Sequence, residues 1–364
     1  MLNYLGKRIL QSAIPLIVVV IGVFFLARLT GDPSALYLPL SATEDMKAQF
    51  AAQNGLDLPI FQQLLNFLGG AVTLNFGESM RTGQDAGAMV LQAFPATLQL
   101  AFFTMLFSII IAVVIGCWAA LKPNGVADRI VSFFSMVAAS VPDFWLAILG
   151  IWIFAISFGW LPTSGVQGGP EVWILPVATL MMRPVGVLAQ IVRGSMVTVL
   201  GQPYIKVAYS RGATQFFVVT RHALKNAAAP ALTVAGDLTV GLINGAVVVE
   251  SIFGWPGIGK LMIDSILMRD FPVLQAAVLV TAVAIFILNI VIDLLYAALD
   301  PRVRPTGRSA KQQGKKDNEP PTTGVRTVKP GAIKATVATA SAGSTTSTGT
   351  TTSTQAPGTQ GAGA

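Results

Sequence analysis

The sequence is short of cysteine, histidine and charge. Its 364 residues include one cysteine, Cys117, and one histidine, His222. A disulfide within the chain is therefore excluded, and no Cys/His cluster with the spacing of a metal site occurs. An intramembrane protease would need a nucleophile or a pair of metal ligands inside the bilayer, and neither is apparent. Charged residues make up 11% of the chain, whereas soluble globular domains carry about 25%.

The excess of positive charge does not indicate nucleic-acid binding. The formal net charge is +7, but seven basic and only two acidic residues follow Pro305, which leaves +5 in this tail alone. Most of the other basic residues border apolar segments. A basic tail beneath an anionic inner leaflet explains this distribution, and no nucleic-acid partner is expected.

Long apolar runs are what the chain has in abundance. Hydrophobic residues make up 53% of it, and the mean hydropathy is +0.66. Crossing a hydrocarbon core of about 30 Å takes roughly 20 largely apolar residues in a helix. The runs are continuous, not alternating, which favours helices over the strands of a barrel. The sequence predicts an all-α membrane protein with six transmembrane helices at about 9–29, 95–121, 130–158, 172–199, 228–250 and 273–299.

Basic residues predict the orientation, because short cytoplasmic loops are enriched in Lys and Arg. With a cytoplasmic N-terminus, the inside segments carry Lys7, Arg8, Lys122, Arg129, Lys206, Arg211, Arg221, Lys225, Arg302 and Arg304, and the outside segments only Lys47, Arg81, Lys260 and Arg269. Both termini are therefore expected inside. The first run is too long for a signal peptide and lacks a small-residue cleavage site after it, so it is interpreted as a retained helix.

The segments between the helices differ in length and composition. A long outside segment, 30–94, follows the first helix, and the inside segment 200–227 is rich in basic residues. Residues 1–305 form one membrane domain. The tail 306–364 is rich in Lys and then in Thr, Ser, Gly and Ala, so disorder is predicted for it. No soluble domain is large enough to supply energy for transport.

The inside segment 200–227 predicts two short helices. Pro203 suits the first turn of a helix, Gly212 interrupts the pattern, and a second helical stretch leads to Pro230. Such a segment can dock onto a partner in the cytoplasm or lie along the membrane surface as a basic interfacial helix. The residue pattern alone leaves both interpretations open.

A family resemblance favours docking. Tyr204-Ile-Lys-Val-Ala208-Tyr-Ser-Arg211-Gly212, followed by Arg221-His222-Ala-Leu-Lys-Asn226 and Pro230, resembles the EAA loop of permeases in binding-protein-dependent ABC importers, in the form of the dipeptide, oligopeptide and nickel importers. Further segments match that family in the same order: Asn3-Tyr4 with Lys7-Arg8-Ile9, Gly31-Asp32-Pro33, Asn75-Phe76-Gly77-Glu78-Ser79, Val141-Pro142-Asp143-Phe144-Trp145, the stretch 159–165, the stretch 250–259, and Asp300-Pro301-Arg302. Together they cover residues 1–305.

The resemblance implies a type I ABC importer permease fold and a role in coupling. In such importers the short helix of the EAA loop inserts into a cleft on an ATPase subunit, and ATPase closure drives alternating access. The implied coupling residues are Tyr204, Ala208, Arg211, Gly212 and His222. Relatives usually have Ala-Arg-Ala-Lys-Gly at 208–212, whereas this chain has a bulky tyrosine in second place, which leaves the docking contacts there open.

The resemblance also implies the partners. These are a second homologous permease subunit, two ATP-binding subunits that use ATP and Mg, an extracytoplasmic substrate-binding protein and the lipid bilayer. The permease itself is expected to be non-catalytic, to bind no cofactor or metal, and to lie in the inner membrane of a prokaryote. The expected cargo is a dipeptide or oligopeptide. Nickel, haem or a glutathione-like peptide is the alternative within the family, and a secondary transporter or an intramembrane enzyme is a more distant one.

One motif imitates a nucleotide site. Gly254 to Lys260 matches GxxxxGK, but Leu261 replaces the Ser or Thr that binds magnesium, and no strand is expected before it. The segment is also predicted to lie outside, where there is no ATP. It is interpreted as a tight turn at the outer gate that involves Glu250, Pro256, Gly257 and Gly259.

Polar residues recur on one face of two predicted spans. Asp237 and Asn244 share a face in the fifth, and Arg183 and Gln190 share one in the fourth. Charges inside a membrane normally face a bundle interior or a water-filled cavity, so these four residues are candidates for the translocation path. The alternative is polar contact between helices, which the spacing Gly241-x-x-x-Gly245 favours for its face. From depth along the helices, Asp237 is expected to pair with Arg193 or Gln190.

Overall fold

The structure is a computed structural model that describes residues 2–29, 31–39, 41–165 and 168–299. Within these ranges the regular structure is helical, apart from one isolated antiparallel bridge between Glu78 and Asp85. The predicted tail 306–364 lies outside the described residues, so its predicted disorder is not tested.

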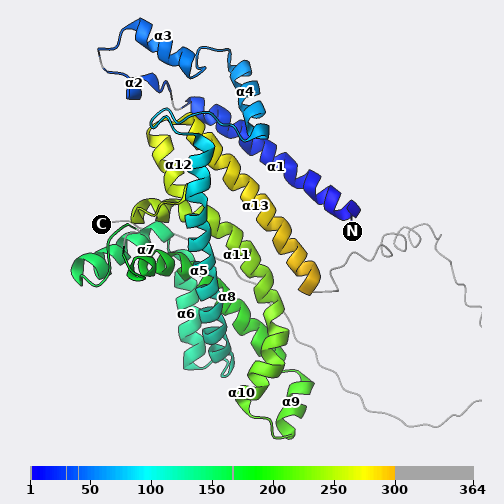
Figure 1. The fold of residues 1–364 in the computed structure, drawn as a ribbon. Coiled ribbons are helices and arrows are strands. Elements are labelled where there is room, and N and C mark those ends of the chain that lie inside the picture. Colours follow the sequence, from blue (N-terminus) through cyan, green and yellow to red (C-terminus); the bar gives the residue numbers. More distant parts are fainter. Residues whose placement is uncertain (1, 30, 40, 166–167, 300–364) are drawn as a thin grey trace, which may run out of the picture. The chain divides into compact units, whose positions relative to one another are not determined.

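Fifteen helical elements follow one another in the described residues (Figure 1). They are α1 (Leu2–Leu29), α2 (Ser34–Tyr37), α3 (Glu44–Gln53), α4 (Ile60–Thr73), α5 (Ala86–Ala120), α6 (Val126–Ser140), α7 (Asp143–Gly150), the π-helix η1 (Ile151–Ser157), α8 (Glu171–Leu200), α9 (Pro203–Ser210), α10 (Gln215–Phe217), the π-helix η2 (Val218–Ala223), α11 (Leu224–Phe253), α12 (Ile258–Leu267) and α13 (Phe271–Leu299).

Four helices in the described residues are long and apolar enough to cross a membrane. They are Ala86–Ala120, Glu171–Leu200, the continuous stretch Gln215–Phe253 and Phe271–Ile292, and a fifth span results if α6 and α7–η1 count as one. The predicted first span, 9–29, lies in α1, whose fully described apolar part Ile17–Leu29 is shorter than a span. The arrangement with six spans therefore stays a prediction.

The prediction of one continuous helix over 130–158 is wrong. The chain bends by 102° between α6 and α7–η1. The break falls at Val141-Pro142, where both residues are extended. Proline has no N–H to continue the hydrogen-bond ladder, and it disfavours helical geometry in the residue before it. The carbonyl of Pro142 instead accepts from the N–H groups of Trp145 and Leu146 and begins α7.

The second predicted span begins later than the helix that contains it. The prediction began at 95, but α5 begins nine residues earlier, where the side chain of Asp85 accepts from the N–H of Ala88 at 2.6 Å. Pro95 lies inside the helix, as Pro176, Pro184 and Pro230 do in α8 and α11. Helices that cross membranes tolerate interior prolines better than soluble ones.

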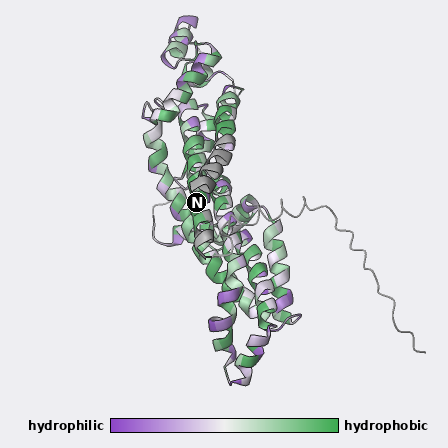
Figure 2. Ribbon diagram, turned by 90° about the vertical axis from the view of Figure 1, so that its right-hand side faces the viewer, coloured by the Kyte–Doolittle hydropathy of each residue, from purple (hydrophilic) through white to green (hydrophobic). Residues whose placement is uncertain are grey.

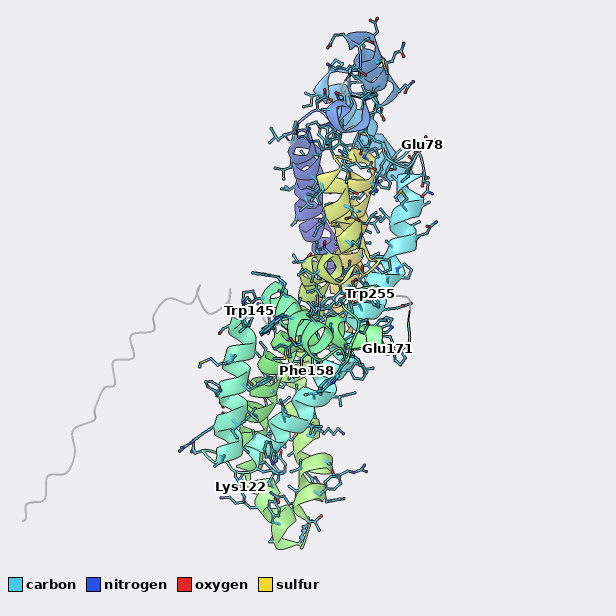
Figure 3. The ribbon with its side chains drawn as sticks, turned by 90° about the vertical axis from the view of Figure 1, so that its left-hand side faces the viewer. Glu78, Lys122, Trp145, Phe158, Glu171 and Trp255 are labelled. Carbon is cyan, nitrogen blue, oxygen red and sulfur yellow. The ribbon has the colours of Figure 1, made fainter. Side chains whose placement is uncertain are left out.

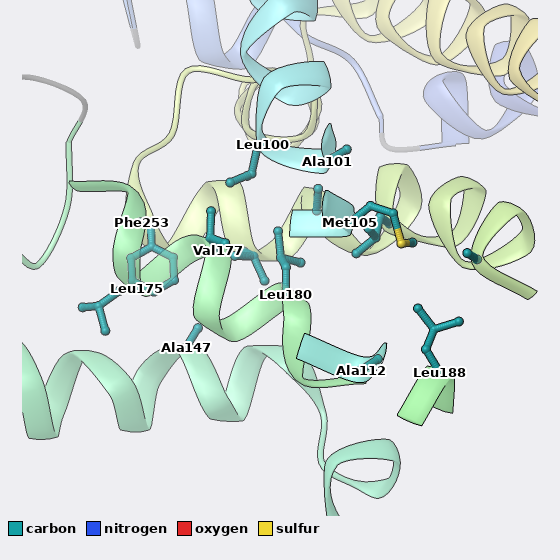
Figure 4. Packing of buried hydrophobic residues seen from close by; sticks show 14 of the residues in the cluster. Leu100, Ala101, Met105, Ala112, Ala147, Leu175, Val177, Leu180, Leu188 and Phe253 are labelled. Atoms are coloured by element: carbon teal, nitrogen blue, oxygen red, sulfur yellow. The ribbon is translucent and has the colours of Figure 1, made fainter. Parts of the chain in front are cut away.

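The helix α5 joins three packed regions of the protein. At 35 residues it is about 52 Å long. Near its start, Ala86 and Val90 pack against Ile258 of α12 and Val273 of α13. Its middle belongs to the largest apolar cluster, formed with α8, α11 and Ala147 of α7 (Figure 4). Its end, Ala120, packs against the helices of the predicted coupling loop.

Many large apolar side chains remain exposed on this single chain, including Phe102, Ile110 and Val114 on α5. Hydrophobic residues follow the long helices, and hydrophilic residues gather around α3 and around α9 and α10 (Figure 2). Extended apolar surface of this kind marks contact with lipid or with other subunits.

Candidate functional site

The inside segment folds as two helices joined by a glycine turn, as the sequence predicted. Pro203 occupies the first turn of α9, where its missing N–H costs nothing. Gly212 has φ +84°, in the left-handed region that disfavours residues with a Cβ. The N–H groups of Gly212 and Ala213 donate to the carbonyls of Tyr209 and Ala208 and close the turn. Thr214 then caps α10 through its hydroxyl, which accepts from Phe217 N.

One side of α9 is anchored in a closely packed apolar cluster. Ile205 is 1% exposed and packs with residues at the ends of three other helices. These are Ala120 of α5, Val192 and Met196 of α8, and Val218 and Ala223 of η2, with Ala208 against them in a half-buried position. The helix is therefore attached to the protein and not merely laid along its surface.

The other side of the helix pair exposes apolar and aromatic side chains. Tyr204, Val207 and Tyr209 of α9 are 43–48% exposed, and Phe216 of α10 is 78% exposed. Arg211 and Gly212 are exposed at the turn between them. We call the surface formed by Tyr204, Val207, Tyr209, Arg211 and Phe216 the coupling surface. It includes Tyr209, the position at which the sequence departs from the family pattern.

The five predicted coupling residues do not all lie on this surface. Ala208 faces the apolar cluster, and His222 is half-buried with its ring edge-on to that of Phe217, 5.4 Å between centroids. The Asn226 amide donates to the Tyr204 hydroxyl and to the His222 carbonyl, both at 3.1 Å. His222 thus supports the position of α9 through its backbone.

An ion pair joins α6 to α8 near the same end. Arg193 donates from Nε and Nη2 to the two carboxylate oxygens of Asp128, the second at 2.7 Å, and the N–H of Asn124 donates to the same carboxylate at 2.8 Å. The Asp128 side chain is 5% exposed and that of Arg193 27%. The expected pairing of Asp237 with Arg193 is therefore wrong, because Asp128 already occupies the guanidinium.

The polar residues of α8 and α11 divide between exposed and half-buried positions. Arg183, Asp237 and Asn244 are exposed, and Gln190 is half-buried. Among the described residues Asp237 has no hydrogen bond or ion pair, so its pairing with Gln190 is not found either. Arg183 acts electrostatically on Asp143 of α7, and a Cβ on Gly245 would lie 3.6 Å from that carboxylate. Asp143 therefore lies near Arg183 and near the part of α11 that carries Asn244. Asp237 lies about 10 Å further along α11.

In the described part of the chain, the Gly241 end of the Gly241-x-x-x-Gly245 spacing does not mark close helix packing. A Cβ added to Gly241 would meet nothing within 4 Å, and the residue is exposed. This face of α11, with Asp237 and Asn244, is open on the single chain. It is available to cargo, to water or to another subunit.

The predicted outer turn is built around one buried carboxylate. Glu250 of α11 is fully buried, and its Oε2 accepts from the N–H groups of Gly259 and Lys260 at 2.7 and 3.3 Å. These are the second and third residues of α12, so Glu250 caps the start of that helix from another element. A Cβ on Gly257 or on Gly259 would overlap the Glu250 carboxylate, which explains both glycines.

Trp255 fixes the rest of this turn against neighbouring helices (Figure 3). Its indole N–H donates to Ala96 O of α5 at 3.1 Å, and its ring meets that of Trp173 with 4.5 Å between centroids. The N–H of Ile258 donates to the Thr97 hydroxyl. Pro256 lines a shallow pocket with Gly257 and Lys260. Glu250, Pro256, Gly257 and Gly259 are thus brought together as predicted, although their role in gating is not tested.

The same geometry is not that of a nucleotide site. A P-loop follows a strand and offers free backbone N–H groups to phosphate. Here the helix α11 precedes the motif, and the Glu250 carboxylate already occupies two N–H groups at the start of α12. The Lys260 ammonium pairs with Asp264.

Two polar contacts were not predicted from the sequence. In the sequence, Asp128 is one polar residue of a predicted turn. Its partner Arg193 lies 65 positions further along the chain. Asp270, which is 4% exposed, accepts from the Ser79 hydroxyl at 2.5 Å and from Met80 N, and so attaches the outside segment to the start of α13. A polar residue next to an apolar run was the available signal, but the partner depends on the tertiary fold.

Comparisons with known proteins agree on one family. The family described as "Binding-protein-dependent transport system inner membrane component" matches residues 112–305. The chain is 36% identical over 305 residues to the glutathione transport system permease protein GsiC of Escherichia coli (strain K12), covering 84% of this chain and 99% of that protein. It is 35% identical over 309 residues to the probable peptide ABC transporter permease protein y4tP of Sinorhizobium fredii (strain NBRC 101917 / NGR234), with 83% and 99% covered.

A solved structure shares the fold. An inward-facing structure of the MetNI methionine ABC transporter contains a chain similar to this one, with a TM-score of 0.50 and 16% sequence identity. The match covers 58% of this chain and 96% of that one.

Proposed function

The chain belongs to the family of binding-protein-dependent transport system inner membrane components, and we propose that it forms part of the translocation path of an importer for short peptides. As a member it is a non-catalytic, multi-pass permease subunit of a bacterial ABC importer in the inner membrane. ATP is hydrolysed by partner chains, and a binding protein supplies the cargo. The proposal concerns how this chain couples ATPase movement to transport, and which cargo it carries.

The observation that carries the proposal is the coupling surface. A short helix is exposed on one side and packed through Ile205 on the other. Exposed aromatic residues on a fixed helix are suited to insertion into a cleft on a partner, since Tyr and Phe supply contact area at low entropic cost. The partner proposed for this surface is an ATPase subunit, with Tyr204, Arg211 and Gly212 at the contact.

Packing supports transmission of movement from this surface. Ile205 lies in one cluster with Val192 and Met196 of α8 and with Val218 of η2, which continues into α11. Close-packed interiors are barely compressible. A displacement of α9 would therefore move the inner ends of α8 and α11 together, and the Arg193–Asp128 pair would carry α6 with them.

In this proposal the translocation path is lined by the polar residues of α8 and α11. Arg183, Asp237 and Asn244 are exposed on helices that are otherwise strongly apolar, and Gln190 lies on the same predicted face as Arg183. Charges within such helices are tolerated where they face a water-filled cavity or a partner subunit. We place them towards the second, homologous permease, so that the path lies between the two subunits and two ATPases bind below.

The topology of this proposal has six spans, with both termini in the cytoplasm and the segment 30–94 outside. The asymmetry of basic residues supports it. In this orientation the Glu250 turn and α12 lie at the outer gate, and the outside segment faces the binding protein.

Short peptides are proposed as cargo because of the relatives' names. One similar protein is named for glutathione and another for peptides. Nickel and haem are the second candidates, from the sequence resemblance.

Transport by the assembled importer in proteoliposomes tests the proposal. ATP hydrolysis and uptake would be measured with peptides of two to six residues, glutathione, nickel and haem, with the binding protein present and absent. We expect peptide-dependent hydrolysis and uptake that both need the binding protein and the ATPases. Uptake by this chain alone, or labelling of the Tyr204–Gly212 turn from the exterior, would contradict it.

A further inference from the structure

A cavity near the end of α1 lies apart from the proposed path. It has a volume of about 240 Å³, which is below the roughly 300–1,000 Å³ of pockets for whole drug-sized ligands. Four separate parts of the chain line it. They are Arg28 of α1, residues 54–56 before α4 with Gln63, Asn66 and Phe67 within it, residues 75–77 with Met80, and Phe271, Pro272 and Gln275 of α13.

Among the described residues, the lining is basic and includes no acidic residue. Arg28 is its single charged side chain, and within the described part of the chain this residue has no ion pair. Asp270 precedes Phe271, but its carboxylate accepts from Ser79 and Met80 and it does not line the cavity. A cation would therefore find no counter-charge here.

The Arg28 guanidinium is held in one orientation. Its Cζ lies 4.0 Å from the centroid of the Phe24 ring and 5.4 Å from that of Phe271. Its Nε donates to the Gln63 amide oxygen at 3.1 Å. The Nη1 atom is buried and has no hydrogen-bond partner, so the fixed guanidinium still has an unused donor.

Gln275 also lines the cavity and carries a second unpaired donor. Gln275 is 6% exposed, and its Nε2 atom is buried without a hydrogen-bond partner. It lies one turn after Phe271 on α13, so both side chains share a face of the helix. Leaving a buried donor unpaired costs free energy that an acceptor would recover.

Three of the other lining amides are already engaged, and the fourth, Asn66, is exposed. The Asn54 amide donates to Phe50 O, Gln63 donates to the carbonyls of Leu56 and Leu58, and the Asn75 side chain accepts from Gly77 N. The unused buried groups are both N–H donors, one of them charged. This combination is complementary to an anionic acceptor, and the planar guanidinium matches a carboxylate in particular.

We propose that this cavity binds the carboxylate group of a small organic acid or short peptide, through the Arg28 guanidinium and the Gln275 side-chain amide, which both line it. The apolar walls formed by Leu56, Phe67, Phe76 and Phe271 leave room for one residue beside the carboxylate. The site goes beyond the proposed transport function, which supplies only the choice of peptide probes.

Calorimetric titration of the full chain in nanodiscs tests the site. The probes are acetate, diglycine and diglycine with an amidated C-terminus, which removes the carboxylate charge. We expect acetate and diglycine to bind, with diglycine the tighter, and the amide to bind at least tenfold more weakly than diglycine, because amidation removes the charge that the guanidinium pairs with. Equal affinity for diglycine and its amide would overturn the proposal.

Two variants and a matched control locate the binding. Gln275→Glu places a carboxylate in the cavity at nearly unchanged volume, so it should pair with Arg28, reduce acetate affinity more than tenfold and leave the unfolding midpoint unchanged or higher. Arg28→Gln should reduce acetate affinity to a similar extent. Gln62→Glu makes the same chemical change on the exposed face of α4 and should bind as the unchanged protein does.

These measurements distinguish failure of the proposed carboxylate site from failure of the proposed transport function. Acetate binding that Gln275→Glu abolishes supports the site whatever cargo the importer carries. Acetate binding that survives Gln275→Glu overturns it even if Arg28→Gln fails to fold. Loss of binding-protein association in Arg28→Gln, with no binding of acetate or diglycine, would also overturn it, because the cavity would then receive a protein side chain.

Discussion

The two ends of α5 are held in different ways. At the start of α5, the contacts around α12 and α13 include the fully buried Glu250 and the nearly buried Asp270, both with backbone N–H partners. At its end, α9 is held by the apolar side chains around Ile205. Buried polar contacts need specific partners and specify one arrangement, whereas apolar packing is less directional. The difference suits a fixed outer turn and an inner helix that meets a second protein.

The most destabilising change should be one that separates α11 from α12. Gly259→Ala would place a Cβ onto the Val247 backbone and the Glu250 carboxylate. Overpacking of this kind costs about 1–3 kcal/mol, and here the upper end is expected because backbone must move. Thermal unfolding in nanodiscs measures it. Gly241→Ala, at an open helical position, is the control. Equal midpoints for the two variants would mean that the outer turn is not fixed.

The inner end of α5 also has one polar contact nearby, the Arg193–Asp128 ion pair. Asp128→Ala and Arg193→Ala should each destabilise the protein by about 2 kcal/mol, below the roughly 3–5 kcal/mol of fully buried pairs, since Arg193 is still 27% exposed. The double variant should cost less than the sum of the two. A double-mutant cycle by thermal unfolding provides the coupling energy. Additive effects would show that the pair does not connect α6 to α8.

Coupling can be impaired with a smaller change in stability. Gly212→Ala places a Cβ at φ +84°, where nothing crowds it but the backbone disfavours it by about 1–2 kcal/mol. We expect a folded protein whose assembled importer loses most peptide-stimulated ATP hydrolysis. Gly201→Ala, at φ −75° with ordinary contacts, is the control. Full stimulation in Gly212→Ala would contradict the coupling role of the turn.

The smallest effect is expected on the coupling surface itself. Tyr204→Phe removes the hydroxyl that accepts from Asn226, and because the contact is exposed the cost should be about 0.5 kcal/mol. Uptake should then change less than twofold, whereas Tyr204→Ala, which also removes the ring, should reduce it more. Uptake by the two variants at equal protein amounts distinguishes them, and equal uptake would exclude the ring from the contact.

Helix patterns were the most predictable part of the fold. Long apolar runs placed α5, α8, α11 and α13, and Pro203 with Gly212 placed the helix pair of the coupling loop. Local residues decide these features. Two short helices were missed, because α3 lies within a polar segment and is capped by Thr43, and α12 depends on a cap from Glu250.

Pairings between distant residues were the least predictable part of the site. Depth along a helix placed Arg193 beside Asp237, but the angle around each helix axis was unknown, and Arg193 faces Asp128 instead. Proline was ambiguous for a related reason. Pro142 lies at the bend of the chain, whereas α5 continues through Pro95, and the residue type alone does not distinguish these outcomes.

The residues along the chain were enough to predict a helical membrane protein with an EAA-type turn and a glycine at its corner. Periodicity, composition and backbone sterics are local, so they can be read along the chain. The three-dimensional fold was needed to show that Glu250 caps α12, that Ile205 anchors the inner helix, and that Arg28 and Gln275 line one cavity. Each of these depends on how helices rotate and meet, and packing of the whole chain sets that rotation.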